Sequence, residues 1–139
     1  MATRFLAAAL ACACYMATAL AQTASPAEWF QWRGPNRDGI SAETGLLQAW
    51  PKAGPSQVWR INGVGNGYSS FSTSGGRLYT LGARAGTEYV VALDRATGRK
   101  VWETANGRRY QNDRGDGPRS TPTVDGDRLY VGRVRAKLL

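Results

Sequence analysis

The side chains that most often carry out acid–base, nucleophilic or metal chemistry are scarce in this chain of 139 residues. There is no histidine, which excludes a Ser-His-Asp triad, a Cys-His pair, a histidine-ligated zinc site and an imidazole pH switch. Both cysteines, Cys12 and Cys14, lie near the N-terminus, so the remainder of the chain has neither thiol chemistry nor a disulfide. We therefore predict no catalytic, cofactor-binding or metal-ligating residue, and no cofactor, for this chain.

The carboxylates fall where turns are expected. Asp94 lies in a short turn between two strand-like runs. Other aspartates lie in glycine-rich loops: Asp113, Asp116, Asp125 and Asp127. A calcium loop over 113–125 is disfavoured, because Arg114 and Arg119 are interleaved with its oxygen donors. The glycine-rich residues 63–67 precede another strand-like run, so no helix N-terminus is available there to bind a phosphate.

Basic residues outnumber acidic ones, with 18 Lys+Arg against 10 Asp+Glu and a formal net charge of +8. Arg108, Arg109 and Tyr110, together with Arg114 and Arg119, could form a basic patch on loops. No platform of alternating aromatic and basic residues indicates nucleic-acid binding, so nucleic acid is not an expected partner. An anionic polysaccharide or a lipid head group fits the charge better, and the plain alternative is a solvated arginine-rich surface.

Residues 1–21 have the three parts of a secretory signal peptide: a positive charge at Arg4, a short apolar run over 5–16, and the small-residue site Ala19-Leu20-Ala21. The apolar run is shorter than the roughly 20 residues that a transmembrane helix needs. We predict export to the periplasm or the extracellular space, with cleavage after Ala21. A buried helix of the mature fold is one alternative. A lipidated cysteine is another, although the residues before both cysteines depart from the leucine-led lipobox.

Residues 22–56 form an N-terminal linker and packing segment. The stretch 29–39 is too rich in aromatic side chains for a free tail, so we expect it to pack on the domain. Residues 41–50 could hold a short helical turn, capped by Ser41 and ended by Pro51.

Five strand-like runs follow, each with β-branched or aromatic residues and bounded by Gly, Asn or Asp: residues 57–61, 69–73, 77–81, 88–93 and 100–104. The separators between the last four are short. Successive strands should therefore be antiparallel neighbours, which predicts a four-stranded meander over 69–104.

The pattern of residues 69–79 returns in residues 120–130, at an offset of 51. The two segments place Gly75 and Gly126 at the same point, and each continues with Arg-Leu-Tyr. A period near 50 that contains four short strands is the size of a propeller blade. The alternative is a chance likeness between two ordinary hairpins.

Residues 91–102 resemble the A-x-D-x-x-T-G-x-x-x-W tryptophan-docking motif of quinoprotein-type propellers. Five motif positions match: Ala92, Asp94, Thr97, Gly98 and Trp102. In such a turn the aspartate accepts backbone N–H groups and the glycine takes a positive φ. In these propellers the tryptophan packs between blades, against the turn of a neighbour. Residues 29–39 and 116–122 also look like segments of secreted bacterial PQQ-like (pyrroloquinoline quinone repeat) β-propeller proteins.

This resemblance implies an all-β fold, a β-propeller of four-stranded antiparallel blades, of which residues 57–132 hold about one and a half. A closed propeller needs at least four blades. Residues 133–139 depart from the family pattern, so we expect an N-terminal fragment with an out-of-family tail; a small protein that ends there is the alternative. Such a partial propeller is expected to leave four aromatic side chains uncovered: Trp59, Tyr79, Trp102 and Tyr130.

The resemblance implies two classes of function. The first is a binding or assembly scaffold, similar in role to the outer-membrane-protein assembly factor, whose blade loops hold a protein or glycan partner. The second is the N-terminal part of a PQQ-dependent alcohol or sugar dehydrogenase, which would bring PQQ with Ca²⁺. We favour the scaffold, because no residue of this segment has the character of a cofactor ligand.

Overall fold

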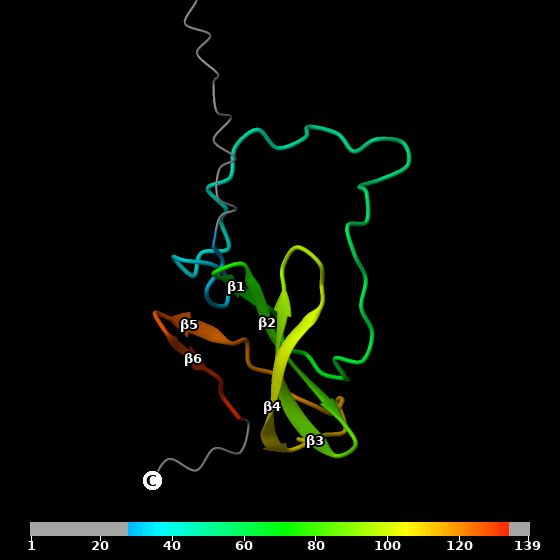
Figure 1. Cartoon of the computed structure of the whole chain (residues 1–139), viewed down its shortest axis with the longest axis vertical. Helices are drawn as coiled ribbons and strands as arrows, with labels where there is room; N and C mark the ends of the chain where they lie inside the picture. Colours follow the sequence, from blue (N-terminus) through cyan, green and yellow to red (C-terminus); the bar gives the residue numbers. More distant parts are fainter. Residues whose placement is uncertain (1–27, 134–139) are drawn as a thin grey trace, which may run out of the picture.

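The computed structural model describes residues 28–133, and this part of the chain is all-β, with no helix. A four-stranded sheet has the order β1 (Ser72–Ser74), β2 (Arg77–Arg84), β3 (Thr87–Asp94) and β4 (Lys100–Arg108), with every neighbouring pair antiparallel (Figure 1). A separate hairpin consists of β5 (Thr123–Asp125) and β6 (Arg128–Tyr130). The all-β class and the antiparallel meander predicted from the sequence are confirmed.

Three predicted segments fall outside the described residues, in whole or in part. These are the signal peptide over 1–21, with Cys12 and Cys14, residues 22–27 of the N-terminal segment, and residues 134–139 of the predicted tail. For these residues the interpretations stay predictions.

Tight turns join β1 to β2 and β2 to β3. Gly75 and Gly76 both have positive φ, 58° and 72°, which is the geometry of the two-residue turn whose twist matches that of a hairpin. The second turn uses Ala85 at φ 47° and Gly86 at φ 78°. These turns hold β1, β2 and β3 in an uninterrupted antiparallel register.

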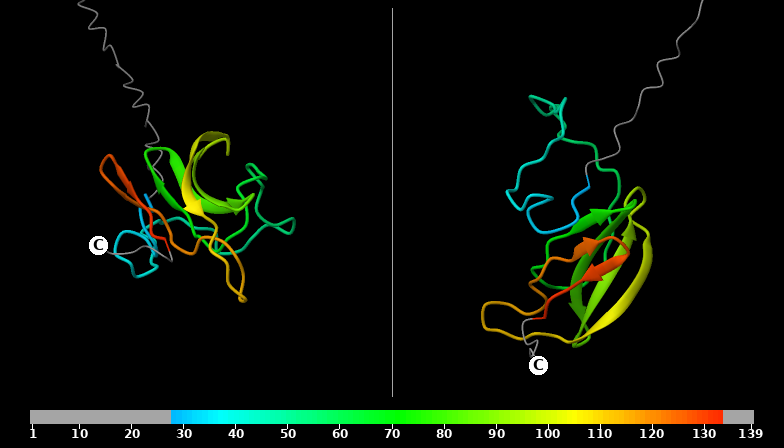
Figure 2. Two further views of the ribbon diagram at one scale, coloured as in Figure 1. Left: turned by 90° about the horizontal axis from the view of Figure 1, so that it is seen from below. Right: turned by 90° about the vertical axis from the view of Figure 1, so that its left-hand side faces the viewer.

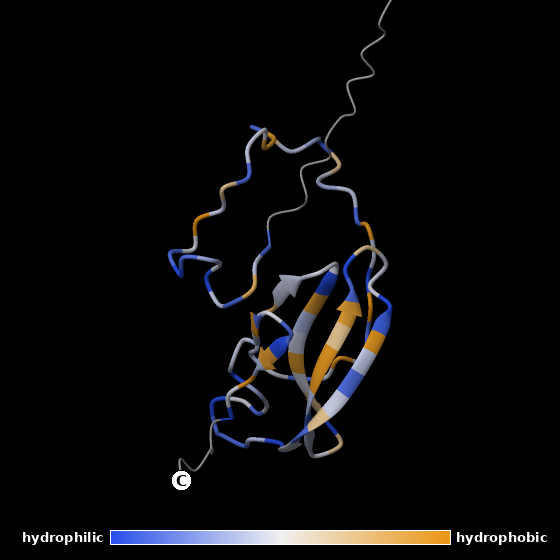
Figure 3. Cartoon of the chain, turned by 60° about the vertical axis from the view of Figure 1, so that its left-hand side comes forward, coloured by the Kyte–Doolittle hydropathy of each residue, from blue (hydrophilic) through white to orange (hydrophobic). Residues whose placement is uncertain are grey.

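The core centres on β3. Val90, Val91, Ala92 and Leu93 are all buried, so successive residues are covered although they point to opposite faces of the sheet. A strand covered on both faces has a continuous apolar run in place of alternation. Figure 3 shows this as a continuous orange stretch on β3 beside more mixed flanking strands.

The second hairpin repeats the first. Ser72 pairs with Tyr79 in the first hairpin, and Thr123 pairs with Tyr130 in the second. Every pair in β5–β6 lies 51 residues after its counterpart in β1–β2, so the repeat found in the sequence is a repeat of strand register. The hairpin lies beside β1, with which β5 is in contact (Figure 2).

The aromatic N-terminal stretch joins the two hairpins. The backbone of Trp29 exchanges two hydrogen bonds with Thr73 of β1, at 3.2 and 2.8 Å. The carbonyl oxygen of Phe30 accepts the N–H of Val124 in β5 at 2.7 Å. The expectation that residues 29–39 pack on the domain is therefore confirmed at its first two residues.

The predicted strand over 57–61 is wrong. These residues pair with no strand, because Trp59 and Ile61 contact the turn after β3 through their side chains and not through a backbone edge.

Of the four aromatic side chains predicted to be uncovered, Tyr130 is exposed, so the prediction is confirmed there. It is wrong for Trp59, Tyr79 and Trp102, which are half-buried, and the Trp59 ring lies against the turn after β3.

The strand predicted over 69–73 is displaced and shorter. β1 covers only Ser72–Ser74. Before Ser72, side-chain hydrogen bonds to β2 take the place of backbone pairing. The hydroxyl of Ser69 accepts the N–H of Leu81 at 3.2 Å, and the hydroxyl of Thr80 donates to the carbonyl of Ser70 at 3.1 Å.

The helical turn suggested for 41–50 is absent, and the residues are irregular and exposed. The Ser41 hydroxyl does accept the N–H of Glu43, at 3.2 Å. Gly45 then takes a φ of 72°, which ends any helical turn, and no surface covers an apolar face. In Figure 1 this stretch runs in a wide loop away from the sheet.

Candidate functional site

The turn after β3 has the geometry that the docking motif predicts. The Asp94 carboxylate oxygen Oδ1 accepts the backbone N–H of Thr97 at 2.8 Å and its hydroxyl at 2.7 Å. The N–H of Gly98 donates to the Asp94 carbonyl at 2.8 Å, and Gly98 has a φ of 71°. Asp94, Thr97 and Gly98 therefore form one closed turn between β3 and β4.

The hydrogen bond from the Thr97 side chain is the largest cause that lowers the pKa of Asp94, followed by the N–H of the same residue. A carboxyl whose pKa is lowered by folding contributes stability above its unfolded pKa, and this contribution is lost as the pH falls through the lowered value. We expect an NMR titration to place the Asp94 midpoint below the ordinary aspartate range. Thr97→Val should raise the midpoint, and Thr104→Val on β4 should leave it unchanged. An unchanged midpoint in Thr97→Val would contradict this account.

A tryptophan from far upstream covers this turn. The indole N–H of Trp59 donates to the carbonyl of Arg95 at 2.9 Å. A Cβ placed on Gly98 would lie 2.6 Å from the Trp59 ring and 3.0 Å from Ile61, so only a glycine fits beneath them. Trp59 is thus docked on the turn that the motif defines, and the sequence analysis missed this role. The repeated Val-Trp dipeptide, at 58–59 and 101–102, is the signal that could have found it.

The other two motif residues are paired on the neighbouring strands β3 and β4. Ala92 of β3 is fully buried and pairs with Trp102 of β4. Trp102 is half-buried, and its ring centroid lies 6.1 Å from that of Tyr79. The packing of Trp102 between blades stays a prediction.

Glu103 on β4 lies between two cations. Its carboxylate accepts a hydrogen bond from the Lys100 ammonium at 2.8 Å and pairs with the Arg84 guanidinium at 2.6 Å. These contacts, that of Lys100 first, lower the pKa of Glu103. Arg84 also lies over the Tyr89 ring of β3 at 4.1 Å. The ion pair between Arg84 and Glu103 therefore connects β2 to β4 across β3.

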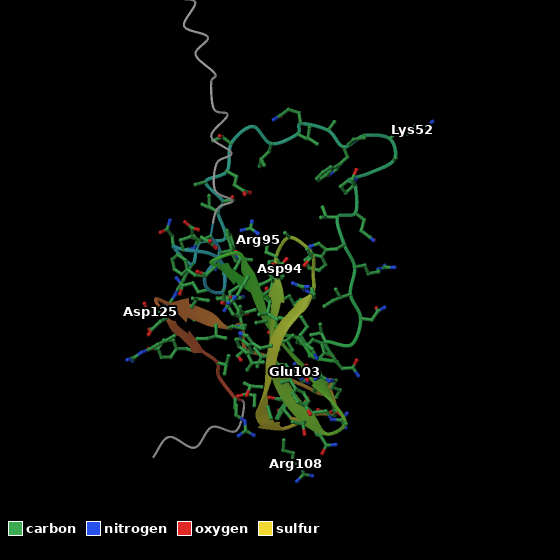
Figure 4. The ribbon with its side chains drawn as sticks, in the orientation of Figure 1. Lys52, Asp94, Arg95, Glu103, Arg108 and Asp125 are labelled. Atoms are coloured by element: carbon green, nitrogen blue, oxygen red, sulfur yellow. The ribbon has the colours of Figure 1, made fainter. Side chains whose placement is uncertain are left out.

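A second candidate site lies at the opposite end of the sheet, in residues 109–119 with Tyr68; we call it the arginine–tyrosine loop. Figure 4 places Arg108, which precedes this loop, far from Asp94. Asp116 organises the loop, because its carboxylate accepts the N–H of Asn112 at 3.1 Å and pairs with Arg109 at 3.3 Å. Of the arginines in the predicted basic patch, Arg109 is therefore paired within the loop.

Two shallow cavities flank this loop. One, of about 440 Å³, is bounded by Tyr110, Asn112, Asp113, Arg114 and Arg119. The other, of about 480 Å³, is bounded by Gly65, Asn66, Gly67, Tyr68, Arg109 and Asp116. The glycine-rich residues 63–67 thus border a cavity, and Asn66 pairs with Ala83 of β2. Both cavities are lined by polar groups and a tyrosine ring, and the second also by glycine backbone.

Within residues 28–133, no three Asp, Glu, Cys or His side chains lie close enough to hold a metal ion. The same part of the chain contains no helix that is long and apolar enough to span a bilayer.

Comparison of the chain with family models, with curated proteins and with solved structures found no match. Its function is therefore inferred from the docked turn at one end of the sheet and the arginine–tyrosine loop at the other.

Proposed function

We propose that the chain supplies about one and a half blades of a PQQ-like β-propeller and serves as a binding or assembly scaffold outside the cytoplasm. The observation that carries this proposal is the repeated register of β1–β2 and β5–β6 at an offset of 51 residues. A period of this length, beside a complete four-stranded antiparallel sheet, is what successive blades would produce.

The docked tryptophan supports the same proposal. Trp59 lies on a turn of the docking-motif type, although it comes from a segment that precedes the sheet. Trp102 occupies the motif position from which a second such contact would be made to a following blade. Repeat units bury their apolar faces against neighbours, so a chain of such contacts would join the blades.

A scaffold needs binding surfaces and no catalytic group, and both ends of the sheet are consistent with this role. Asp94, Thr97 and Gly98 are used in hydrogen bonds within the turn, and the arginine–tyrosine loop offers a polar recognition surface. The second candidate is the PQQ-dependent alcohol or sugar dehydrogenase, favoured only by the resemblance of residues 91–102. In that case the groups that hold PQQ and Ca²⁺ would come from outside this chain.

The gene region after codon 139, read in all three frames, tests the proposal. We expect further docking motifs at intervals of about one blade, near 50 residues. A vicinal cysteine pair with Glu, Asn and Asp ligands would favour the dehydrogenase. A region without any further copy of the motif would overturn the propeller.

Export is part of the proposal and has its own test. Because Ala19-Leu20-Ala21 follows an apolar run that lacks charge, we expect the exported protein to begin at Gln22. Intact-mass analysis of the secreted or periplasmic fraction measures this directly. A product that retains Met1, or one with a lipid on Cys14, would contradict the cleavage site.

A further inference from the structure

Arginines gather around the arginine–tyrosine loop more densely than the acids that could neutralise them. Arg108 ends β4, Arg109, Arg114 and Arg119 belong to the loop, and the guanidinium of Arg133 lies against Gly107. Three acids accompany these five arginines: Asp113, Asp116, which is already paired with Arg109, and the buried Glu88, whose carboxylate accepts the N–H of Tyr110 at 3.0 Å. This end of the sheet therefore carries an excess of positive charge, which attracts anionic ligands.

Arg119 is held in a fixed position. Its guanidinium lies 4.7 Å from the centroid of the Tyr68 ring and 5.6 Å from that of Tyr110, and it donates to the carbonyl of Gly115 at 2.7 Å. A planar guanidinium held in this way keeps N–H groups available for a planar acceptor at little entropic cost. Because Arg119 lines the cavity, its guanidinium can pair with a carboxylate bound there.

Arg114 borders the same cavity, and its backbone is fastened on both sides. Its N–H donates to the Asn112 side-chain oxygen at 2.9 Å, and its carbonyl accepts the Tyr68 hydroxyl at 3.2 Å. Within the described range 28–133, its guanidinium forms neither an ion pair nor a hydrogen bond. A cation whose backbone is fixed and whose guanidinium has no internal partner is a candidate for an external one.

We propose that the arginine–tyrosine loop binds an acidic polysaccharide that carries uronic-acid carboxylates. Arg114 and Arg119 pair with successive carboxylates, and Tyr68, a residue that is 57% exposed, packs the ring face opposite Arg119 against a sugar. This inference rests on the proposed scaffold function and names its partner.

The lining of the cavities favours a sugar over an acidic peptide. Peptide and protein partners usually anchor an apolar or aromatic side chain in a desolvated pocket. The two cavities have no aliphatic, Phe, Met or Trp side chain in their walls. They present Asn112 and Asn66, whose amides can bond to hydroxyl groups, beside tyrosine rings that can cover C–H faces.

Binding to the full chain, immobilised on a sensor surface at physiological ionic strength, tests the proposal. The probes are an oligogalacturonate, its methyl ester and a polyglutamate of equal charge. We expect the oligogalacturonate to bind best and the uncharged ester to lose binding. Arg114→Gln should weaken binding about tenfold, since one lost charge-assisted pair is worth about 1.4 kcal/mol. The matched control, Arg128→Gln, removes an arginine that is 75% exposed on β6 and should change binding less than about twofold.

Three outcomes would overturn the proposal. Polyglutamate that binds as tightly, with the same dependence on Arg114, would identify an acidic peptide surface as the partner. Equal losses in Arg114→Gln and Arg128→Gln would reduce the loop to a solvated charged surface. No binding of any probe would exclude the site. None of these outcomes affects the search for further repeats in the gene, and a failure of that search would leave a positive binding result in place.

Discussion

Replacing Trp59 by alanine is expected to lower the free energy of unfolding by about 3 kcal/mol, at the lower end of the range for a buried tryptophan because the ring is half-buried. The substitution removes the 2.9 Å hydrogen bond to the Arg95 carbonyl and uncovers Gly98. Urea denaturation followed by far-UV circular dichroism measures the change. Trp59→Phe keeps most of the packing and should lose about 1 kcal/mol, the share of the hydrogen bond.

The chain contains its own control for this experiment. Trp50 is 69% exposed in the wide loop, so Trp50→Ala should change the free energy of unfolding by less than about 0.5 kcal/mol. Equal effects at the two positions would show that the Trp59 contact does not hold this part of the fold.

The sheet could be predicted from the sequence because its signals are local. β2, β3 and β4 each follow a turn rich in glycine or aspartate and carry β-branched or aromatic residues. The predictions stop too early for β2 and β4, which continue to Arg84 and Arg108. The additional residues contribute few apolar side chains, and cross-strand pairing extends the strands beyond the apolar pattern.

Residues 57–61 show why local pattern is insufficient. Their composition is typical of a strand, yet a strand needs a free backbone edge, and these residues contact the sheet through Trp59 and Ile61. Composition cannot distinguish these two ways of packing.

The contacts of the candidate sites also differ in whether a local pattern can predict them. The Asp94 turn closes over five residues, so its aspartate, threonine and glycine could be assigned through the resemblance of this short stretch to the docking motif. The Trp59 contact spans 36 residues, and the Tyr68 contact with Arg114 spans 46. Such contacts depend on how the chain returns to the sheet, which the spacing of residues along the sequence does not reveal.

Gly98→Ala is expected to be the most damaging change of a single methyl group in the docked turn. The φ of 71° costs an alanine about 1–2 kcal/mol. The new Cβ would also lie 2.6 Å from the Trp59 ring, and relieving such overpacking costs about 1–3 kcal/mol more. Thermal and urea unfolding of the variant should show both losses together.

Gly76 separates the two costs, because it has a nearly identical φ of 72° and a methyl group added there would have no neighbouring atom within 4 Å. Gly76→Ala should therefore show only the backbone cost, and the excess loss in Gly98→Ala comes from the contacts with Trp59 and, at 3.0 Å, with Ile61. In a Trp59→Ala background most of that excess should disappear, so the two substitutions at the contact are coupled. Gly76→Ala and Trp59→Ala should be additive. If Gly98→Ala and Gly76→Ala cost the same in both backgrounds, Trp59 does not lie on the turn in solution, and the contact that supports the propeller proposal is lost with it.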